Sequence, residues 1–510
     1  MNRLTKFFKD FMHQVYVISN TDKPLMPTVR FGKVRRMLKS GRAIVISRKP
    51  FTIKLLYDTP EIVQSLTLGI DPGTNNIGVA VRREDRVAVF FGELETRTQQ
   101  ITENMKERKA HRMARRRHQR EKIKRRVIIK DIKIRYESFG GIISSQNPPF
   151  LAFVDKNFLI DMGYNGELHW KKQESEILSA PIEAHYAVTN YCNAKCPSCY
   201  MDSNINYRNE SLENAKYVAE KLSKLDIFHV ALGGGESFSL PWFLELAFFF
   251  REKGIIPNVT TNGYFITDKI AEKCKVFGQV NVSIDSLNEE DGITRLPHFK
   301  KADAAIKTLK SKNIRTGINC VISRKNYNQL EKIIAYGKKI GANDIEFLRF
   351  KPVGRGAKIY HENALTKEQA INLFPMLKKF SWRYKIKIKL DCSFTPFICY
   401  HKPNKKLLEY FSILGCDAGN WLIGVDPKGN ALPCSFIKTG AIPIDSLKNI
   451  WEERETFGKF RLWNKNPDPL CSKCDYLDIC KGGCKAISIF LKNSYEAADP
   501  ECPFICAVNR

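Results

Sequence analysis

The hydrophobic pattern of the chain changes character near residue 181. Before this point, short apolar runs alternate with polar turns, which is typical of β-strands. These runs lie at 15–19, 43–47, 51–56, 66–70 and 87–95. A strongly basic stretch with a helical pattern follows from Thr98. Residues 138–180 lack clear periodicity and are expected to form a linker with irregular structure.

After residue 181, strand-like and helix-like runs alternate regularly. The runs AHYAVTN, HVALGGGE, NVTTNG, VNVSIDS, TGINCVIS and DIEFLRF are typical of strands, and helix-period segments lie between them. This βα repeat predicts a parallel sheet with helices outside it, either open or closed into a barrel. In such folds the ligand site lies at the C-terminal ends of the strands.

The charge of the chain indicates an acidic partner. The 510 residues carry a formal net charge of +29, which favours nucleic acid first and an anionic membrane surface second. Much of this charge is local, since residues 106–135 hold 15 Lys/Arg against 3 Asp/Glu. Composition is otherwise ordinary for a globular protein, with 43% hydrophobic residues.

The 15 cysteines are expected to bind metal rather than form disulfides. The basic start of the chain lacks the continuous apolar run of a secretory signal. The most apolar stretch, 238–250, contains Pro241 and Glu245 and is too short to span a bilayer. A cytoplasmic location is therefore expected, and clustered cysteines in a reducing compartment favour metal.

Three cysteines follow the first strand of the βα repeat. Cys192, Cys196 and Cys199 form a C-x3-C-x2-C motif on a predicted loop. Three thiolates at this spacing can hold three irons of a 4Fe–4S cluster and leave the fourth iron open. The alternatives are free buried cysteines and a zinc site, although zinc normally takes a fourth ligand.

This motif, in this place, resembles the radical S-adenosylmethionine (SAM) superfamily. The resemblance implies a partial (β/α)6 barrel, with the open iron chelating SAM, which is cleaved reductively to a 5′-deoxyadenosyl radical that abstracts a substrate hydrogen. Cys192, Cys196, Cys199 and Glu236 would be the catalytic set. The strand ends would contact SAM through Gly234, Gly235, Glu236, Ser283 and Asp285. The chain departs from the family at Ser198, where an aromatic residue usually precedes the third cysteine; here Tyr200 follows it.

The C-terminal cysteines have an ordered spacing of their own. Cys416, Gly429 and Cys434 are followed by a C-x2-C-x5-C-x3-C segment and a further cysteine. The set resembles the SPASM domain, which adds two auxiliary 4Fe–4S clusters to radical SAM enzymes; a zinc ribbon is the alternative. The resemblance implies one cluster on Cys471, Cys474, Cys480 and Cys502, and another on Cys416, Cys434 and Cys484.

The fourth ligand of that second-named cluster stays open in the sequence. Cys392 or Cys399 are candidates, or the iron is left free for substrate. Cys506 is expected to be a bystander thiol, and Cys274 and Cys320 are expected to be plain core cysteines.

The N-terminal third has motifs of a different kind. PLMP (24–27), GIDPGTNNIGVAV with Asp71, and the arginine-rich segment resemble, in this order, the N-terminal part of IscB-type nucleases, also of the RRXRR type. The resemblance implies a PLMP module, an incomplete RNase H/RuvC-like α/β segment and a basic bridge-like helix. Nuclease activity is not expected, because a two-metal site needs several carboxylates and Asp71 stands alone as a structural relic.

The basic helix is expected to bind RNA or another nucleic acid, because guanidinium groups suit phosphates. A merely solvated helix is the alternative. The candidate contacts are Arg108, Arg112, Arg115, Arg116, Arg117, Arg120, Arg125 and Arg126.

These observations predict an α/β fusion of five parts. They are a PLMP-like module (1–66), a RuvC-like segment with the basic helix (67–136), a linker (137–180), a radical SAM domain (181–390) and a SPASM-like domain (391–510). SPASM enzymes as a family mostly modify peptides or proteins, so the first hypothesis is a peptide or protein maturase with three 4Fe–4S clusters and SAM. A flavodoxin-type reductase would donate its electrons, and a bound RNA would act as a scaffold or guide. Modification of RNA or DNA, and a non-catalytic iron–sulfur regulator that binds nucleic acid, are the alternatives.

Overall fold

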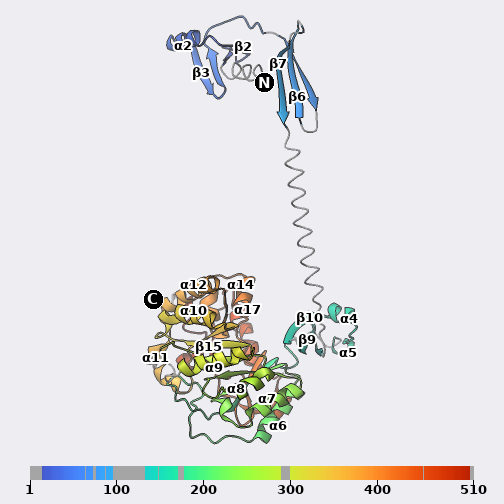
Figure 1. The fold of residues 1–510 in the computed structure, drawn as a ribbon, viewed down its shortest axis with the longest axis vertical. Coiled ribbons are helices and arrows are strands. Elements are labelled where there is room, and N and C mark those ends of the chain that lie inside the picture. The colour runs from blue at the N-terminus through green and yellow to red at the C-terminus, as the bar shows by residue number, and fades with distance from the viewer. Residues whose placement is uncertain are drawn as a thin grey trace. The chain divides into compact units, whose positions relative to one another are not determined.

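The computed structural model describes residues 14–63, 65–72, 76–84, 86, 88–95, 132–147, 149–170, 177–288, 299–451 and 453–505. The chain divides into two compact units, Met1–Ile128 and Ile129–Arg510 (Figure 1), and each is described by itself. No helix among the described residues is long and apolar enough to cross a membrane.

The first unit contains two small sheets. The strand-like runs of the sequence form both of them, as expected. The strands and helix described are β1 (Val15–Ile18), β2 (Pro24–Thr28), α2 (Phe31–Lys39), β3 (Ala43–Arg48), β4 (Phe51–Leu55), β5 (Leu66–Pro72), β6 (Asn76–Arg83) and β7 (Ala88–Glu95). One sheet has the order β2-β1-β4-β3 and the other β5-β6-β7. Val34 of α2 packs with Val15, Ala43, Ile53 and Leu55 in a small core.

The segment expected to be a linker (137–180) is folded instead, and residues 133–136, expected to belong to the basic helical segment, form a strand. It contains β8 (Lys133–Glu137), β9 (Gly140–Gln146), β10 (Pro149–Asp155), α4 (Lys156–Asp161) and α5 (Glu167–Trp170), with the three strands in one antiparallel sheet. Strand β9 was not predicted, because glycine and serine are not typical of strands. Buried Arg135 ties this sheet to the rest of the unit by donating to the carbonyls of Ala180 and Pro181 at 2.9 and 2.8 Å.

The main sheet of the second unit confirms the βα repeat. In the described part of the chain it runs β17-β16-β15-β14-β13-β12-β11-β18-β19-β20, and β11 to β17 are all parallel. The barrel thus has seven parallel strands in sequence rather than six. The strands are β11 (Glu183–Thr189), β12 (His229–Gly234), β13 (Ile256–Thr261), β14 (Val280–Ser283), β15 (Thr316–Ile322), β16 (Asp344–Arg349) and β17 (Lys387–Leu390).

Amphipathic helices connect these strands and lie outside the sheet (Figure 1). They are α6 (Leu212–Lys224), α7 (Phe243–Glu252), α8 (Asp268–Lys273), α9 (Phe299–Ser311), α10 (Leu330–Ile340), α11 (Tyr360–Asn363) and α12 (Lys367–Tyr384). Side chains of Ser211 and Thr267 cap α6 and α8, and Thr366 forms a capping box with Gln369 at α12. These caps fix where each helix begins.

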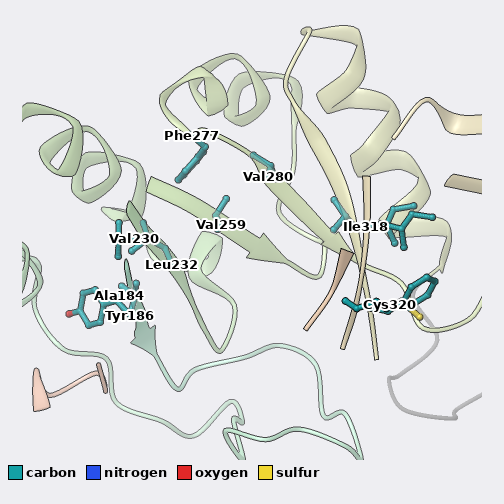
Figure 2. Packing of buried hydrophobic residues seen from close by; sticks show 14 of the residues in the cluster. Ala184, Tyr186, Val230, Leu232, Val259, Phe277, Val280, Ile318 and Cys320 are labelled. Atoms are coloured by element: carbon teal, nitrogen blue, oxygen red, sulfur yellow. The ribbon is translucent and has the colours of Figure 1, made fainter. Parts of the chain in front are cut away.

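The core lies between the sheet and these helices. Figure 2 shows Val230, Leu232, Val259 and Val280 from neighbouring strands within this buried cluster. Cys274 and Cys320 belong to the same cluster and are fully buried, as expected of core cysteines. The apolar side chains leave the strand ends and the barrel interior to polar residues.

The cysteine-rich region continues the barrel sheet. Its elements are α13 (Thr395–Cys399), α14 (Lys405–Tyr410), β18 (Leu422–Val425), β19 (Asn430–Leu432), β20 (Ile442–Pro443), α15 (Leu447–Ile450), α16 (Lys459–Arg461), α17 (Leu477–Cys480) and α18 (Lys485–Lys492). Strand β18 pairs in parallel with β11, whose C-terminal end leads to Cys192. This pairing brings the C-terminal region beside the first cysteine motif.

Candidate functional site

The SAM-cluster loop (residues 190–204) carries the first cysteine motif directly after β11. The Cys192 N–H donates to the Asn204 carbonyl at 3.1 Å, which closes the loop at its base. Backbone N–H groups of Ala194 and Ser203 donate to the sulfurs of Cys192 and Cys199, both at 3.4 Å. Such donors favour the thiolate form that binds iron.

Arg355 clamps this loop from a distant part of the chain. Its Nε donates to the Cys196 carbonyl at 2.9 Å, and its Nη1 to the Ser203 carbonyl at 2.9 Å. Gly354 has φ of +61°, and a Cβ there would lie 2.5 Å from the Cys199 carbonyl oxygen. No sequence pattern indicated this clamp, because Arg355 is 153 residues beyond its ion-pair partner Asp202.

The glycines after β12 are required by the loop itself. A Cβ on Gly235 would lie 1.9 Å from the Tyr191 carbonyl oxygen, and one on Gly234, with φ of +104°, 2.4 Å from that of Thr189. No side chain fits at these distances. Close packing of the β12 end against the SAM-cluster loop therefore explains both glycines.

Glu236 is 1% exposed and connects three strand ends. Its carboxylate accepts from Thr261 Oγ1 at 2.7 Å and from the Asn262 N–H at 2.8 Å. Asn262 in turn donates through Nδ2 to Asn193 Oδ1 on the SAM-cluster loop at 2.9 Å. Glu236 is thus held rigidly beside the cysteine motif, and Asn262 is a site residue whose specific contact the sequence did not reveal.

Ser283 and Asp285 lie in different surroundings. Ser283, the last residue of β14, lines the main cavity. Asp285 is 2% exposed and its Oδ1 accepts from the Val321 N–H at 2.7 Å, so it fastens the β14 end to β15. It is not among the residues lining that cavity. Its expected contact with SAM stays a prediction.

A cavity of about 530 Å³ lies at these strand ends. The three motif cysteines, Gly234 to Glu236 and Ser283 line one side of it, and Phe436 and Lys438 of the C-terminal region line another. Its volume falls within the roughly 300–1,000 Å³ typical of small-molecule sites. Asn319 Oδ1, also in the lining, is buried without a hydrogen-bond partner among the described residues, as a polar ligand would require.

Cys192, Cys196 and Cys199 would hold an iron–sulfur cluster, which would supply one iron without a cysteine ligand. Burial raises the pKa of the Cys192 thiol to about 11, so a bound cation is needed to keep it ionised. Tyr200, the aromatic residue after the motif, lies 4.8 Å from the Phe436 ring and lines the cavity as well.

The barrel interior below this cavity is polar. Glu183, His185, Glu346 and Lys389 belong to the lining of this same cavity, although closed barrels are normally filled by branched apolar side chains. His185 Nε2 lies 3.4 Å from Glu183 Oε1. Burial lowers the pKa of His185, but its hydrogen bond to Glu183 and the nearby carboxylates together outweigh this and leave the pKa raised. Charged and polar side chains therefore form part of the cavity wall and can bind a polar group.

The seven SPASM-pattern cysteines form two sets in the structure. The first auxiliary set, Cys416, Cys434 and Cys484, belongs to one buried apolar cluster with Phe350 and Ile437. The second auxiliary set lines a small cavity of about 20 Å³ together with Cys399. Its members are Cys471, Cys474, Cys480 and Cys502. The structure thus brings these cysteines together in two sets, while their roles as ligands of two clusters stay a prediction.

Within the described residues, no group of three or more His, Cys, Asp or Glu side chains is arranged to hold a metal ion. A four-iron cluster spaces its thiolates more widely than one ion does, because each sulfur binds a different iron. The cysteine sets are accordingly defined by the cavities and apolar cluster they share.

Arg349 joins the barrel to the cysteine-rich region. At the end of β16, its Nη1 lies 2.6 Å from Asp499 Oδ2 and its Nη2 2.6 Å from Glu501 Oε2. The Arg349 and Asp499 side chains are 3% and 0% exposed. Asp499 also accepts from the Cys484 N–H at 3.2 Å. This pair was not identified from the sequence, since only the fold brings positions 150 apart into contact.

The eight arginines from Arg108 to Arg126 lie outside the described residues. Asp71 lies in β5, exposed to solvent and opposite Gly78 of β6. Its role as a relic stays a prediction.

Three protein families match the chain. Residues 15–130 match the RRXRR protein family, residues 186–336 the radical SAM superfamily, and residues 416–475 the SPASM iron–sulfur cluster-binding domain. The N-terminal match identifies an RRXRR domain, while the RNase H/RuvC-like identity stays a prediction. The other two imply SAM and a 4Fe–4S cluster at each site.

Several relatives match about two thirds of the chain. Mycofactocin maturase MftC of Mycolicibacterium smegmatis is 28% identical over 338 residues, which is 64% of this chain and 83% of the relative. AdoMet-dependent heme synthase of Methanosarcina barkeri is 26% identical over 345 residues, 64% of this chain and 97% of the relative. PqqA peptide cyclase of Bradyrhizobium diazoefficiens is 22% identical over 352 residues, which is 66% of this chain and 89% of the relative.

The fold is also that of a solved structure. Streptococcus suis SuiB, crystallised with S-adenosylmethionine, superposes with a TM-score of 0.59 at 18% identity, covering 74% of this chain and 100% of SuiB. The cysteine geometry, the cavity and these similarities agree. The chain contains a radical SAM domain, a SPASM domain at its C-terminal side and an RRXRR domain in its N-terminal part, and it is similar to the maturase MftC.

Proposed function

We propose that this enzyme modifies a peptide or protein by abstracting a hydrogen atom from one of its side chains. The observation that carries the proposal is the single cavity that the SAM-cluster loop, Glu236 and the C-terminal Phe436 and Lys438 line together. SAM bound to the open iron supplies the hydrogen-abstracting radical when an electron arrives. The residues of the chain then bind, orient and shield the reacting groups.

The polar barrel interior supports a side-chain substrate. Glu183, His185, Glu346 and Lys389 offer both charge signs to a group that enters below the cluster. Burial raises the pKa of Glu346, which makes this carboxylate a stronger base than an exposed one. A cavity of about 530 Å³ has room for SAM and one inserted side chain, and not for a folded substrate.

Several relatives act on or bind peptides, which favours a peptide substrate. SuiB was also crystallised with its precursor peptide SuiA, and the PqqA peptide cyclase names its peptide. The heme synthases act on a different class of molecule. The proposed substrate is a short peptide encoded beside this gene. The proposed electron donor is a flavodoxin-type reductase, and the proposed location is the cytoplasm.

The test is purification without oxygen, followed by reduction with SAM and the neighbouring peptide. We expect about twelve irons per chain, 5′-deoxyadenosine by mass spectrometry, and a changed peptide mass. Omitting the peptide is the matched control. If 5′-deoxyadenosine forms and the mass of co-purified RNA changes while that of the peptide does not, the enzyme modifies RNA instead of a peptide. Iron without SAM cleavage under any reductant would leave a metal-bearing binding protein.

We further propose that the N-terminal third binds structured RNA without cleaving it. The support is the excess of 15 Lys/Arg over 3 Asp/Glu in residues 106–135. If about six phosphates are contacted, log affinity falls with log salt at a slope of about −5. Fluorescence anisotropy with a labelled hairpin from 50 to 200 mM salt measures it.

Replacing Arg115, Arg116 and Arg117 by glutamine should make this slope shallower by about one for each phosphate that is no longer bound. The control is glutamine at Lys300, Lys301 and Lys307, on helix α9 of the radical SAM domain. A slope that the arginine changes leave unaltered contradicts RNA binding by this segment.

A further inference from the structure

Two hydrogen-bond acceptors that line the main cavity have no partner in the described part of the chain. We infer that Asn319 and Glu346 together bind a cationic side chain of the peptide, that of lysine or arginine, and so select the residue that enters the cavity. The inference rests on the proposed function, because it takes the cavity to be the place where a peptide side chain is inserted. It names the chemical class of that side chain.

The register of the sheet places the two acceptors beside each other. Asn319 of β15 pairs with Glu346 of β16, and Glu346 pairs in turn with Lys389 of β17. Neighbouring strands lie about 4.8 Å apart, and residues in register point to the same face of the sheet. All three side chains line the cavity. The two acceptors therefore form one row on adjacent strands, with a lysine next to them.

Asn319 lines the cavity with a carbonyl oxygen that is not used. The residue is 7% exposed, and its Nδ2 donates to Thr260 Oγ1 at 3.2 Å. This bond fixes the amide, and Oδ1 is buried without a hydrogen-bond partner among the described residues. Buried acceptors in folded proteins are normally satisfied. A bound group that carries an N–H or O–H would therefore complete the site.

Glu346 is a half-buried carboxylate without a cation of its own. Burial raises its pKa, and the charge of Lys389 opposes this rise only in part. Lys389 forms its ion pair with Asp344 instead, at 3.0 Å. Arg315 also approaches Asp344, at 3.8 Å, but its side chain is 58% exposed, so water screens its charge. The carboxylate of Glu346 thus keeps a negative charge that a bound cation would neutralise.

The other charged side chains of the cavity lining already have partners. Three cations are paired with carboxylates: His185 with Glu183, Arg349 with Asp499, and Lys351 with Asp391. Lys438 is exposed and donates to the Met201 sulfur at 3.3 Å. The other carboxylates, those of Glu183, Glu236 and Asp426, also have partners of their own. Glu346 is therefore the carboxylate of the lining that is available to a ligand.

A lysine or arginine side chain meets both requirements. Each carries a positive charge and several N–H donors, so one donor can bind Asn319 Oδ1 while the charge pairs with Glu346. A neutral amide or hydroxyl would leave the charge of the carboxylate unmatched, and an acidic side chain would be repelled by it. The apolar part of the lining, which includes Leu232 and Val259, suits the methylene groups of a long cationic side chain.

The test measures binding without any turnover. Full-length protein, reconstituted with iron and sulfide and saturated with SAM, is titrated anaerobically in a calorimeter with lysine or arginine blocked as the N-acetyl methylamide. Blocked norleucine, which lacks the ammonium, and blocked glutamate are the matched control ligands. We expect both cationic probes to bind at least about tenfold more tightly than either control. Equal binding of cationic and control probes, or no binding of the cationic ones, overturns the inference.

Variants assign the preference to this site. Glu346→Gln keeps the shape of the side chain and removes its charge, so it should weaken the binding of blocked lysine by about tenfold. Glu346→Asp keeps the charge and should recover part of this loss. Glu252→Gln, at the exposed end of helix α7, is the control and should bind blocked lysine as the parent does. Parent-like affinity in Glu346→Gln contradicts the inference.

Further outcomes separate this inference from the proposed function. If Glu346→Gln weakens the binding of SAM as much as that of blocked lysine, the acceptors belong to the SAM site and the inference fails. If the enzyme modifies a peptide whose inserted residue is neutral or acidic, the inference fails and the proposed function stands. If blocked lysine binds and the binding depends on Glu346, the inference holds even where no peptide is modified.

Discussion

Cys196→Ala is expected to reduce SAM cleavage to background while the protein stays folded. The variant removes one of the three thiols on the SAM-cluster loop, and two thiols do not hold a cluster with an open iron. The loop keeps its path, because Arg355 binds the Cys196 carbonyl at 2.9 Å and not its side chain. The measurements are 5′-deoxyadenosine by mass spectrometry and iron per chain, which should fall from about twelve to about eight.

Lys195→Ala is the matched control for this change. Lys195 is exposed on the same loop and does not line the cavity, so the control should keep full iron content and cleavage. Cleavage by Cys196→Ala at a rate near that of the parent would contradict the assignment of Cys192, Cys196 and Cys199 as the SAM-cluster ligands. Loss of all twelve irons would instead indicate that the loop is needed for folding.

The parallel sheet and its helices could be predicted from the sequence, because the residues within each strand or helix indicate that element. The apolar runs that end at Gly234, Thr261 and Ser283 all form parallel strands, and helices begin at capping residues such as Ser211 and Thr366. The seventh parallel strand, Lys387–Leu390, was missed because it is short and half polar. The folded segment between residues 133 and 170 was missed because glycine and serine weaken its strand pattern.

In the candidate site, too, some residues could be predicted from the sequence and others could not. Residues of short motifs, such as Cys192, Cys199 and Glu236, lie around one cavity as the motif spacing predicts. Contacts between distant segments were not predictable, because no local pattern relates Arg355 to the SAM-cluster loop or Arg349 to Asp499. Asp285 has a structural contact that the sequence did not indicate, since its carboxylate accepts from the Val321 N–H, while its contact with SAM stays a prediction.

Asp499 has a central position between the two auxiliary sets. Its carboxylate accepts from the Cys484 N–H, and its carbonyl accepts from the Cys502 N–H at 3.0 Å. A Cβ on Gly483 would lie 2.4 Å from the Asp499 Cβ, so the backbone of the first set packs directly on it. The Arg349–Asp499 pair therefore fixes both cysteine sets to the end of β16.

Asp499→Ala is expected to destabilise the second unit by about 3–5 kcal/mol, the cost of leaving one buried charge without its partner. Arg349, 3% exposed, would keep Glu501 but lose the bidentate partner at 2.6 and 3.2 Å. The measurement is the urea midpoint of the reconstituted protein, followed by its visible iron–sulfur absorbance. The auxiliary irons should be lost at a lower urea concentration than in the parent.

The double variant Arg349→Met/Asp499→Ala distinguishes an unpaired charge from lost packing. Removing both charges should recover much of the lost stability, because a buried ion pair replaced by apolar groups is often neutral. Glu245→Ala, which breaks the exposed 2.6 Å pair with Lys216, is the control and should barely move the midpoint. If Asp499→Ala behaves like Glu245→Ala, the cysteine-rich region is held to the barrel by the β11–β18 pairing and apolar packing, and the Arg349–Asp499 pair contributes little.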